Sequence, residues 1–332
     1  MKIKFKISKL ANLFFFISNL SEWSPYCRKK YNQVWLKRNP LKRNEKEALG
    51  NIRNALKKHK NIKRHFFKSE KEVWRGVSQQ LTEKEKETLR FSLKIFLPRF
   101  EKLWNKREKE LYQISRVFSK KSLLINKSLK VLKFLYAPRS VPESVTIFLL
   151  INPITEHLVG GGGKISSQAI VLECSHITKQ NNPHHFFSRV LLHEIIHMAY
   201  EDRVKKVIKR YLDSRKFKNI EPTLRKSAVY KETRSFLGTI KEIVAVSLLP
   251  EGYLSEYLFK TNIKKSLLRR KSVRNRNLEH AYYDLMLFAV WELYPIAREY
   301  YIKKKRIDVQ FIEEAAEVWK NFYHANLAKW RP

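Results

Sequence analysis

The sequence predicts a helix-dominated α+β fold with one small mixed sheet. Residues 44–135 carry helical patterns rich in Lys and Glu, and the pattern over 277–329 predicts two further helices. Two short β-rich apolar runs, Val145–Ile151 and Ala169–Cys174, lie on either side of the glycine loop 160–163. The predicted sheet therefore precedes the histidine-bearing helix described below.

Proline positions suggest how the 332 residues are organised. Pro138 marks the change from a basic helical N-terminal region, residues 1–138, to a mixed region with C-terminal helices, residues 139–332. Within the first region, Pro98 is expected to kink or end the helix predicted over 81–118. A chain of this length can bury a substantial core.

The segment 190–199 contains the pattern H-E-x-x-H with uncharged residues on both sides. On a helix, residues four apart differ by about 40° of rotation and about 6 Å of rise, so His193 and His197 can reach one zinc ion. Glu194 would then lie beside the metal, where it can take a proton from zinc-bound water. This helix is expected to continue as far as Leu212, with a loop over 214–222 after it.

A catalytic zinc site needs a third protein ligand and a water molecule. The best candidate in the sequence is Glu242, the one carboxylate embedded in the strongly apolar helical run 241–249. Ala245 lies one turn later on the same face and would let this helix approach the histidine helix closely. These residues favour a buried metal centre between two helices.

With these motifs, residues 141–260 resemble the gluzincins, a class of zincin-like zinc metallopeptidases. The resemblance implies a catalytic domain over residues 139–332 in which Zn²⁺ is held by His193, His197 and Glu242, with Glu194 as general base. Some gluzincins place the third ligand in an E-G-x-x-x-E-Y segment, which makes Glu251 the alternative. Glu251 could instead favour the dipole of the following helix, and Glu242 is preferred.

The resemblance also suggests where substrate binds. Residues 165–172 would form an edge strand that pairs with an extended peptide, or would merely support the active helix. A side chain that donates to the transition-state oxyanion is expected from His280, Tyr282 or Tyr283, although aromatic residues on a helix more often belong to a core.

The formal net charge of +38 is unevenly distributed. Residues 1–140 contain 37 Lys and Arg against 11 acidic residues, whereas residues 141–200 contain only three basic residues. A nucleic acid or an anionic membrane surface would fit such a charge. No zinc finger, RNP or G-K-[ST] signature accompanies it, and an AT-rich genome that fills solvent-exposed positions with lysine is the preferred explanation.

Only two cysteines, Cys27 and Cys174, are present, which predicts a reducing compartment and a cytoplasmic protein. The four lysines of residues 1–9 and the apolar run 10–20 partly match a signal peptide but lack a cleavage site, and eleven residues cannot span a bilayer. An amphipathic or buried helix is expected there, with membrane-surface association or export as alternatives.

The function that these residues predict is zinc-dependent hydrolysis of a peptide or protein substrate. The alternative is a catalytically inactive binding protein with a zincin-like fold, which could bind nucleic acid through its basic surface. An intact Glu194 favours the enzyme, because a binding module needs no general base.

Overall fold

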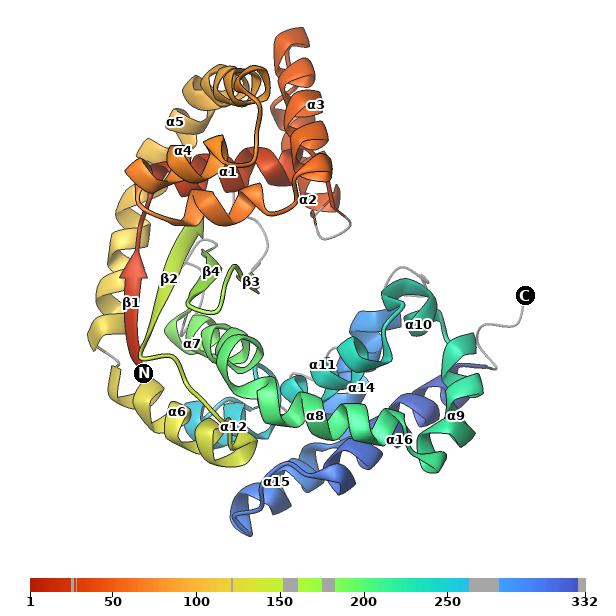
Figure 1. The fold of residues 1–332 in the computed structure, drawn as a ribbon. Helices are drawn as coiled ribbons and strands as arrows, with labels where there is room; N and C mark the ends of the chain where they lie inside the picture. The colour runs from red at the N-terminus through yellow and green to blue at the C-terminus, as the bar shows by residue number, and fades with distance from the viewer. Residues whose placement is uncertain are drawn as a thin grey trace. The chain divides into compact units, whose positions relative to one another are not determined.

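The computed structural model describes residues 1–24, 27, 29–120, 122–151, 161–174, 183–262 and 281–327. These residues form a helix-dominated structure with a four-stranded mixed sheet, as the sequence predicts. The chain divides into two compact units: unit 1 is Met1–Lys120 with Pro142–Phe187, and unit 2 is Lys121–Val141 with Ser188–Pro332 (Figure 1). The units are thus interleaved in sequence and do not follow the ranges 1–138 and 139–332.

Unit 1 contains the sheet and the N-terminal helices. Its elements are β1 (Lys2–Lys6), α1 (Lys9–Leu20), α2 (Lys29–Arg38), α3 (Arg43–Lys58), the 3-10 helix η1 (Ile62–Phe67), α4 (Glu70–Ser78), α5 (Glu83–Lys120), β2 (Ser144–Ile151), β3 (Gly161–Lys164), β4 (Ala169–Cys174) and the first residues of α7 (Pro183–Ile195).

Strand β2 lies at the centre of unit 1. It pairs in parallel with β1 on one side and with β4 on the other, and β3 completes the order β1-β2-β4-β3 by pairing antiparallel with β4. Helices α1 and α5 both pack against β2. A parallel strand covered on both faces requires a nearly continuous apolar sequence. Residues 147–151 of β2 supply one, and all five are buried.

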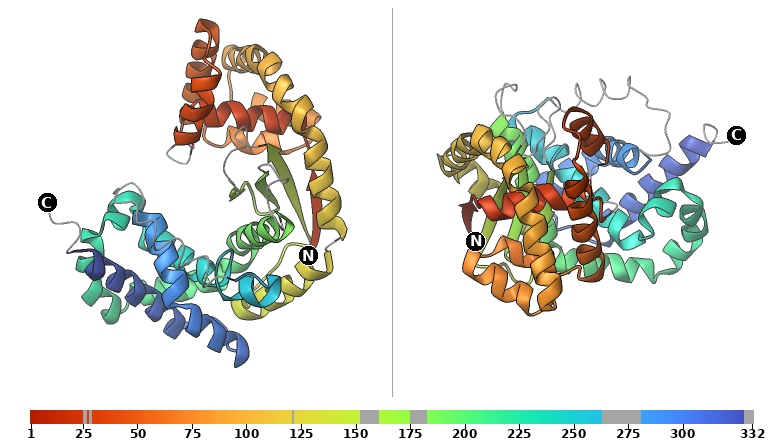
Figure 2. Two further views of the ribbon diagram at one scale, coloured as in Figure 1. Left: turned by 180° about the vertical axis from the view of Figure 1, so that it is seen from behind. Right: turned by 90° about the horizontal axis from the view of Figure 1, so that it is seen from above.

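The first twenty residues form a strand and a buried helix. In β1 the alternating sequence K-I-K-F-K leaves Lys2 and Lys4 exposed and stacks Phe5 on Phe118 of α5, with ring centroids 4.9 Å apart. Figure 2 shows the yellow-orange α5 running along the red strand β1 within this unit. The strand was not predicted, whereas the buried helix was one of the expected alternatives for residues 10–20.

Helix α1 is fixed to the sheet by a buried amide and by aromatic packing. The Asn12 side chain donates to the Leu149 carbonyl at 3.0 Å and accepts from the Ile151 backbone N–H at 2.7 Å, so it satisfies backbone groups at the end of β2. Phe14 stacks on Phe66 of η1 with centroids 3.7 Å apart. The apolar residues of α1 therefore belong to the core of unit 1.

Unit 2 contains helices and no strand among its described residues. Its elements are α6 (Ser122–Tyr136), most of α7, the π-helical segment η3 (Ile196–Tyr200), α8 (Glu201–Leu212), α9 (Arg215–Lys226), α10 (Ala228–Thr233), α11 (Phe236–Leu248), α12 (Tyr253–Phe259), α14 (Ala281–Glu292), α15 (Tyr294–Ile302) and α16 (Val309–Leu327).

Helix α11 is the core element of unit 2. It begins after Ser235, whose side chain accepts from the Gly238 N–H at 2.9 Å as an N-cap. Its residues Ile240, Ile243 and Val244 are fully buried, and the helix contacts α8, α14 and α16. The one carboxylate of this helix is therefore carried on a well-fixed backbone.

Two expectations about element boundaries are wrong: residues 214–222 form most of α9 instead of a loop, and the C-terminal part contains three described helices instead of two. Of the two alternatives expected at Pro98, a kink or an end of the helix, the end is excluded, because α5 continues through Pro98 to Lys120. In α9, Phe217 and Leu224 are buried on either side of the proline at 222, and this packing outweighs the poor helix propensity of proline.

Among the described residues, no helix has both the length and the apolar composition that a membrane crossing requires.

Candidate metal centre

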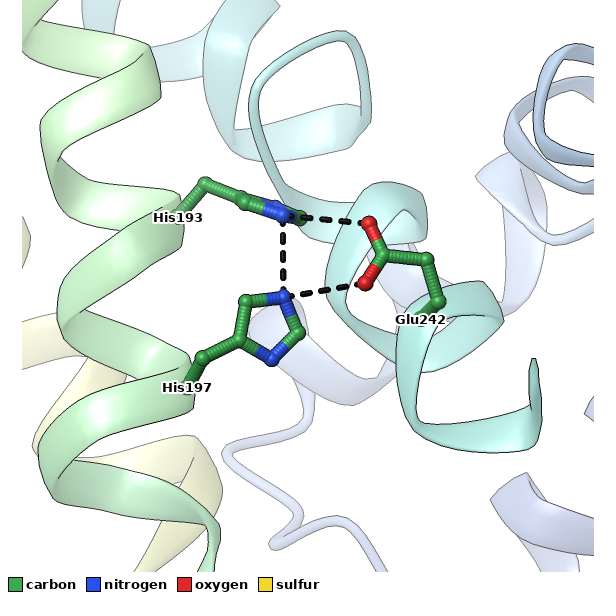
Figure 3. A group of neighbouring side chains, drawn as sticks. All are labelled: His193, His197 and Glu242. Carbon is green, nitrogen blue, oxygen red and sulfur yellow. Dashed lines mark hydrogen bonds and ion pairs between the residues drawn. The ribbon is translucent and has the colours of Figure 1, made fainter. Parts of the chain in front are cut away.

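The helix that carries the H-E-x-x-H pattern changes its winding at the second histidine. His193 and Glu194 lie in the last turn of α7, His197 lies in the π-helical segment η3, and α8 then continues to Leu212 as predicted. Single π-helical turns inside α-helices occur frequently at functional sites. Both imidazoles still point from one face towards α11 (Figure 3).

Two imidazoles and one carboxylate face one another at this place. The Nε2 atoms of His193 and His197 are 2.9 Å apart, and each is 3.1 Å from a different oxygen of the Glu242 carboxylate (Figure 3). Within the described part of the chain, these three residues are the group of histidine, cysteine and acidic side chains whose donor atoms gather closely enough for one metal ion.

The size and chemistry of this triangle fit zinc. Tetrahedral zinc with bonds of about 2.0–2.1 Å has ligand atoms about 3.3 Å apart, so the observed edges need to open only slightly. Two imidazoles and one carboxylate match a common ligand set of catalytic zinc, which leaves a fourth position for water or substrate. The three side chains are between 10% and 24% exposed, so the group lies close below the protein surface.

The second nitrogen of each imidazole has its own partner. Nδ1 of His193 lies 2.8 Å from the Leu249 carbonyl oxygen, and Nδ1 of His197 lies 2.5 Å from Oε1 of Glu201. When Nδ1 donates to these acceptors, the neutral ring presents the lone pair of Nε2 to the centre. The surroundings therefore select the tautomer that a metal needs.

The charged forms of Glu242 and His197 stabilise each other. Burial alone would raise the pKa of the Glu242 carboxyl, but the charges and hydrogen bonds of His193 and His197 hold that pKa well below its usual range. Burial likewise lowers the pKa of His197, yet its contacts with Glu201 and Glu242 outweigh this and raise the pKa to about 10. In the absence of metal, a proton on the imidazole is the charge that holds the two carboxylates together.

Glu194 is placed differently from the other acidic residues. Its carboxylate forms no hydrogen bond or ion pair with any other residue that the structure describes. Burial raises the pKa of Glu194, and the charges of His193 and His197 only partly oppose this. A partly buried carboxylate with a raised pKa, next to a candidate metal ligand and without a partner among the described residues, is suited to accept and return a proton.

The two candidates for the third ligand occupy different positions. Glu242 belongs to the triangle, whereas Glu251 lies in the turn between α11 and α12 and is not part of that group. The position of Glu242 is fixed by the apolar residues of α11, because they bury this helix beside the histidines.

The strand predicted to bind substrate is not an edge strand. β4, which covers residues 169–174, pairs with β2 on one side and β3 on the other, so its backbone groups are already used within unit 1. The edges of this sheet are β1 and β3. For the oxyanion donor, His280 lies outside the described residues, and Tyr282 and Tyr283 lie in the first turn of α14.

Sequence reasoning missed Glu201 and Lys241. Glu201 follows His197 by four residues, a spacing that places two side chains on one helix face, and this signal was available. Lys241 precedes Glu242, and its Nζ lies 2.7 Å from Oε2 of Glu201. Nothing in the sequence indicates that contact, because it joins two helices that are far apart in the chain.

Comparisons with known proteins give no independent guide. No family model matches the chain, and neither the curated proteins nor the solved structures contain a match. The chemistry of the site must therefore be argued from its own residues.

Proposed function

We propose that this chain is a zinc-dependent peptidase of the gluzincin type. The observation that carries the proposal is the convergence of His193, His197 and Glu242, with Glu194 next to the first of them in the sequence. A structural ion-pair cluster would need the histidines and Glu242 but would have no use for Glu194, whose carboxylate has no hydrogen bond or ion pair among the described residues. Glu194 is what favours a catalytic role over a purely structural one.

His193, His197 and Glu242 would hold the zinc ion. When bound, zinc lowers the pKa of a coordinated water and polarises the carbonyl of the bond to be cleaved. Imidazole nitrogen with a single carboxylate oxygen suits zinc better than magnesium or calcium, which prefer sites made wholly of oxygen.

Glu194 is the residue that moves the proton. It accepts a proton from the attacking water, whose oxygen forms a bond to the carbonyl carbon of the substrate. The carbon–nitrogen bond then breaks, and the same carboxyl group returns the proton to the leaving amine. The raised pKa of Glu194 suits both halves of this transfer.

The alternative is a binding protein of the same fold that holds a peptide or nucleic acid. The net charge of +38 is the observation that favours a nucleic-acid partner. Binding of that kind would weaken steeply with salt and would not respond to a chelator.

Metal analysis followed by a cleavage assay tests the proposal. The purified chain, dialysed against zinc and then against metal-free buffer, should retain about one zinc per chain. It should cleave members of a mixed peptide library, lose this activity with a chelator and regain it with zinc. Failure to retain zinc at micromolar concentrations would exclude the assigned function.

Matched variants assign the roles. Glu194→Gln should keep zinc and lose cleavage, and Glu242→Gln should lose zinc. Glu251→Gln, which removes the rival carboxylate, should change neither. Cleavage that survives Glu194→Gln would remove Glu194 from the mechanism.

A further inference from the structure

Glu201 is a buried carboxylate beside the metal centre that is not itself a candidate ligand. Its side chain is 3% exposed, and it lies at the start of α8. Oε1 is 2.5 Å from Nδ1 of His197, while Oε2 is 2.7 Å from Nζ of Lys241 and 3.7 Å from Nζ of Lys205. Burying an ionised carboxylate costs several kcal/mol unless it is paired, so this placement requires a reason.

The contacts of Glu201 and Glu242 connect the same two helical segments. Glu242 of α11 reaches His197 on its Nε2 side, and Glu201 reaches the same ring on its Nδ1 side. Lys241, the residue before Glu242, returns from α11 to Glu201. One imidazole is therefore held from both of its nitrogens, and the helix that supplies a ligand also supplies the cation that holds the opposing carboxylate.

We infer that Glu201 and Lys241 form a positioning pair for His197. Glu201 fixes the tautomer and the ring orientation that point Nε2 to the metal, and Lys241 keeps Glu201 in that position. This inference rests on the proposed zinc site and extends it to two residues that do not touch the metal.

The charges around Glu201 fit the same role. Its Oε2 faces two cations, Nζ of Lys241 at 2.7 Å and Nζ of Lys205 at 3.7 Å, so the carboxylate is paired on the side that does not face His197. Lys241 is the nearer of the two and is 20% exposed, against 40% for Lys205, so it is the cation assigned to the positioning pair.

The test is zinc affinity, measured by competition with a chelator of known affinity, together with the visible absorption of the cobalt-substituted protein. Carboxylates that orient metal-bound histidines typically change metal affinity by about 10- to 100-fold when they are removed. Glu201→Ala should weaken zinc binding within this range and shift the cobalt bands. Glu201→Gln keeps an acceptor for Nδ1 and should recover part of the affinity.

Lys241 is tested through its dependence on Glu201. Lys241→Met should weaken zinc binding when Glu201 is present. In the Glu201→Gln background it should have no further effect, because the negative charge that Lys241 pairs with is gone. The control is Lys216→Met, which breaks an ion pair of 2.9 Å with Glu313 at an exposed site and should leave the metal site unchanged.

The outcomes separate the inference from the proposed function. If the natural chain binds no zinc, the proposed function fails. If the natural chain binds zinc, and both Glu201→Gln and Glu201→Ala bind zinc as tightly as the natural chain with unaltered cobalt bands, only the positioning role fails. Equal effects of Lys241→Met in both backgrounds would remove Lys241 from the pair. Since Glu201→Ala could unfold the chain, the Gln variant keeps the test decisive.

Discussion

The carbonyl oxygen of Leu249 accepts a hydrogen bond from Nδ1 of His193 at 2.8 Å, so the segment that ends α11 also orients a histidine on α7. The following residue is held from two sides, since the Pro250 carbonyl accepts from Nη1 of Arg189 at 2.9 Å and also from the Ser255 hydroxyl. The short turn between α11 and α12 is therefore part of the support of the candidate metal centre.

Gly252 gives a direct test of this turn. A Cβ atom there would lie 2.0 Å from the Ser247 carbonyl oxygen and 2.4 Å from the Leu248 nitrogen, and backbone cannot move as easily as a side chain. Gly252→Ala should destabilise the protein by about 1–3 kcal/mol and weaken zinc binding through displacement of the Leu249 carbonyl. Thermal unfolding and a zinc titration measure the two effects.

Gly50 provides the matched control. It lies within α3, and a Cβ there would meet no other atom within 4 Å. Gly50→Ala should therefore stabilise the protein by about 0.5–1 kcal/mol through helix propensity and leave zinc affinity unchanged. A Gly252→Ala variant as stable as the natural chain would show that the turn tolerates a side chain.

Zinc binding should release a proton. Because contacts with Glu201 and Glu242 outweigh burial and raise the pKa of His197 to about 10, this ring holds a proton at neutral pH when no metal is bound. A zinc ligand must be deprotonated, so zinc affinity should rise by up to tenfold per pH unit between pH 6.5 and 8. Calorimetry in buffers of different ionisation enthalpy should give about one proton released per zinc.

The same pKa fixes the pH dependence of the metal-free fold. A histidine whose pKa is higher in the folded than in the unfolded chain stabilises the fold fully below about pH 6.5. That contribution is lost as the pH rises towards 10. Metal-free protein should thus have a lower Tm at pH 9 than at pH 6.5, and His197→Gln should reduce this difference. An unchanged difference would mean that other groups cause it.

Unit 1 contains a buried clamp between α3 and α5. Arg99 donates to both oxygens of Glu45, at 2.7 and 2.6 Å, and also to the carbonyl of Asn39. Removing Glu45 leaves the Arg99 guanidinium, which is 18% exposed, without its counter-charge, so Glu45→Ala should cost about 1–3 kcal/mol. Burial would raise the pKa of Glu45, but Arg99 lowers it overall, so this stabilisation is present above about pH 4.5 and fades as the pH falls.

An exposed pair is the control for this clamp. Lys9 and Glu101 form an ion pair of 2.8 Å with both side chains more than 40% exposed. Glu101→Ala should cost less than about 1 kcal/mol. Chemical denaturation of both variants at pH 7 and pH 4 measures the difference, and equal costs at pH 7 would contradict the buried role of Glu45.

Much of the fold could be predicted because its signals are local. Local sequence patterns indicate several elements without any tertiary information. These are the apolar runs of β2 and β4, the helix through the H-E-x-x-H pattern and the apolar helix around Glu242. The grouping of His193, His197 and Glu242 could be predicted because a catalytic zinc site needs a third protein ligand, and Glu242 lies on an apolar helix that can approach the histidines closely.

The rest depended on contacts between distant segments. Strand β1 exists because residues 2–6 pair with residues 144–148 of β2, and no local pattern specifies that partner. The interior position of β4 likewise depends on the order of strands. Lys241 was missed for the same reason, since its role is defined by Glu201 and not by its neighbours in the sequence.

Tyr136 is one of several buried residues with a polar atom that has no hydrogen-bond partner among the described residues. Its ring is 1% exposed, and its hydroxyl has no hydrogen-bond partner among the described residues. Burial, together with the charges of Glu201 and Glu242, raises its pKa well above the usual range. An unpaired buried hydroxyl costs about 1–3 kcal/mol, so Tyr136→Phe should raise the free energy of unfolding by about 1 kcal/mol or more and leave zinc affinity unchanged. The backbone carbonyl of Tyr136 accepts from Nε of Arg203 at 3.0 Å, a contact that this substitution preserves.

Urea denaturation of the metal-free protein measures the change in stability caused by Tyr136→Phe. A loss of stability would show instead that a water molecule satisfies the hydroxyl, and a simultaneous loss of zinc affinity would place that water in the support of the metal ligands.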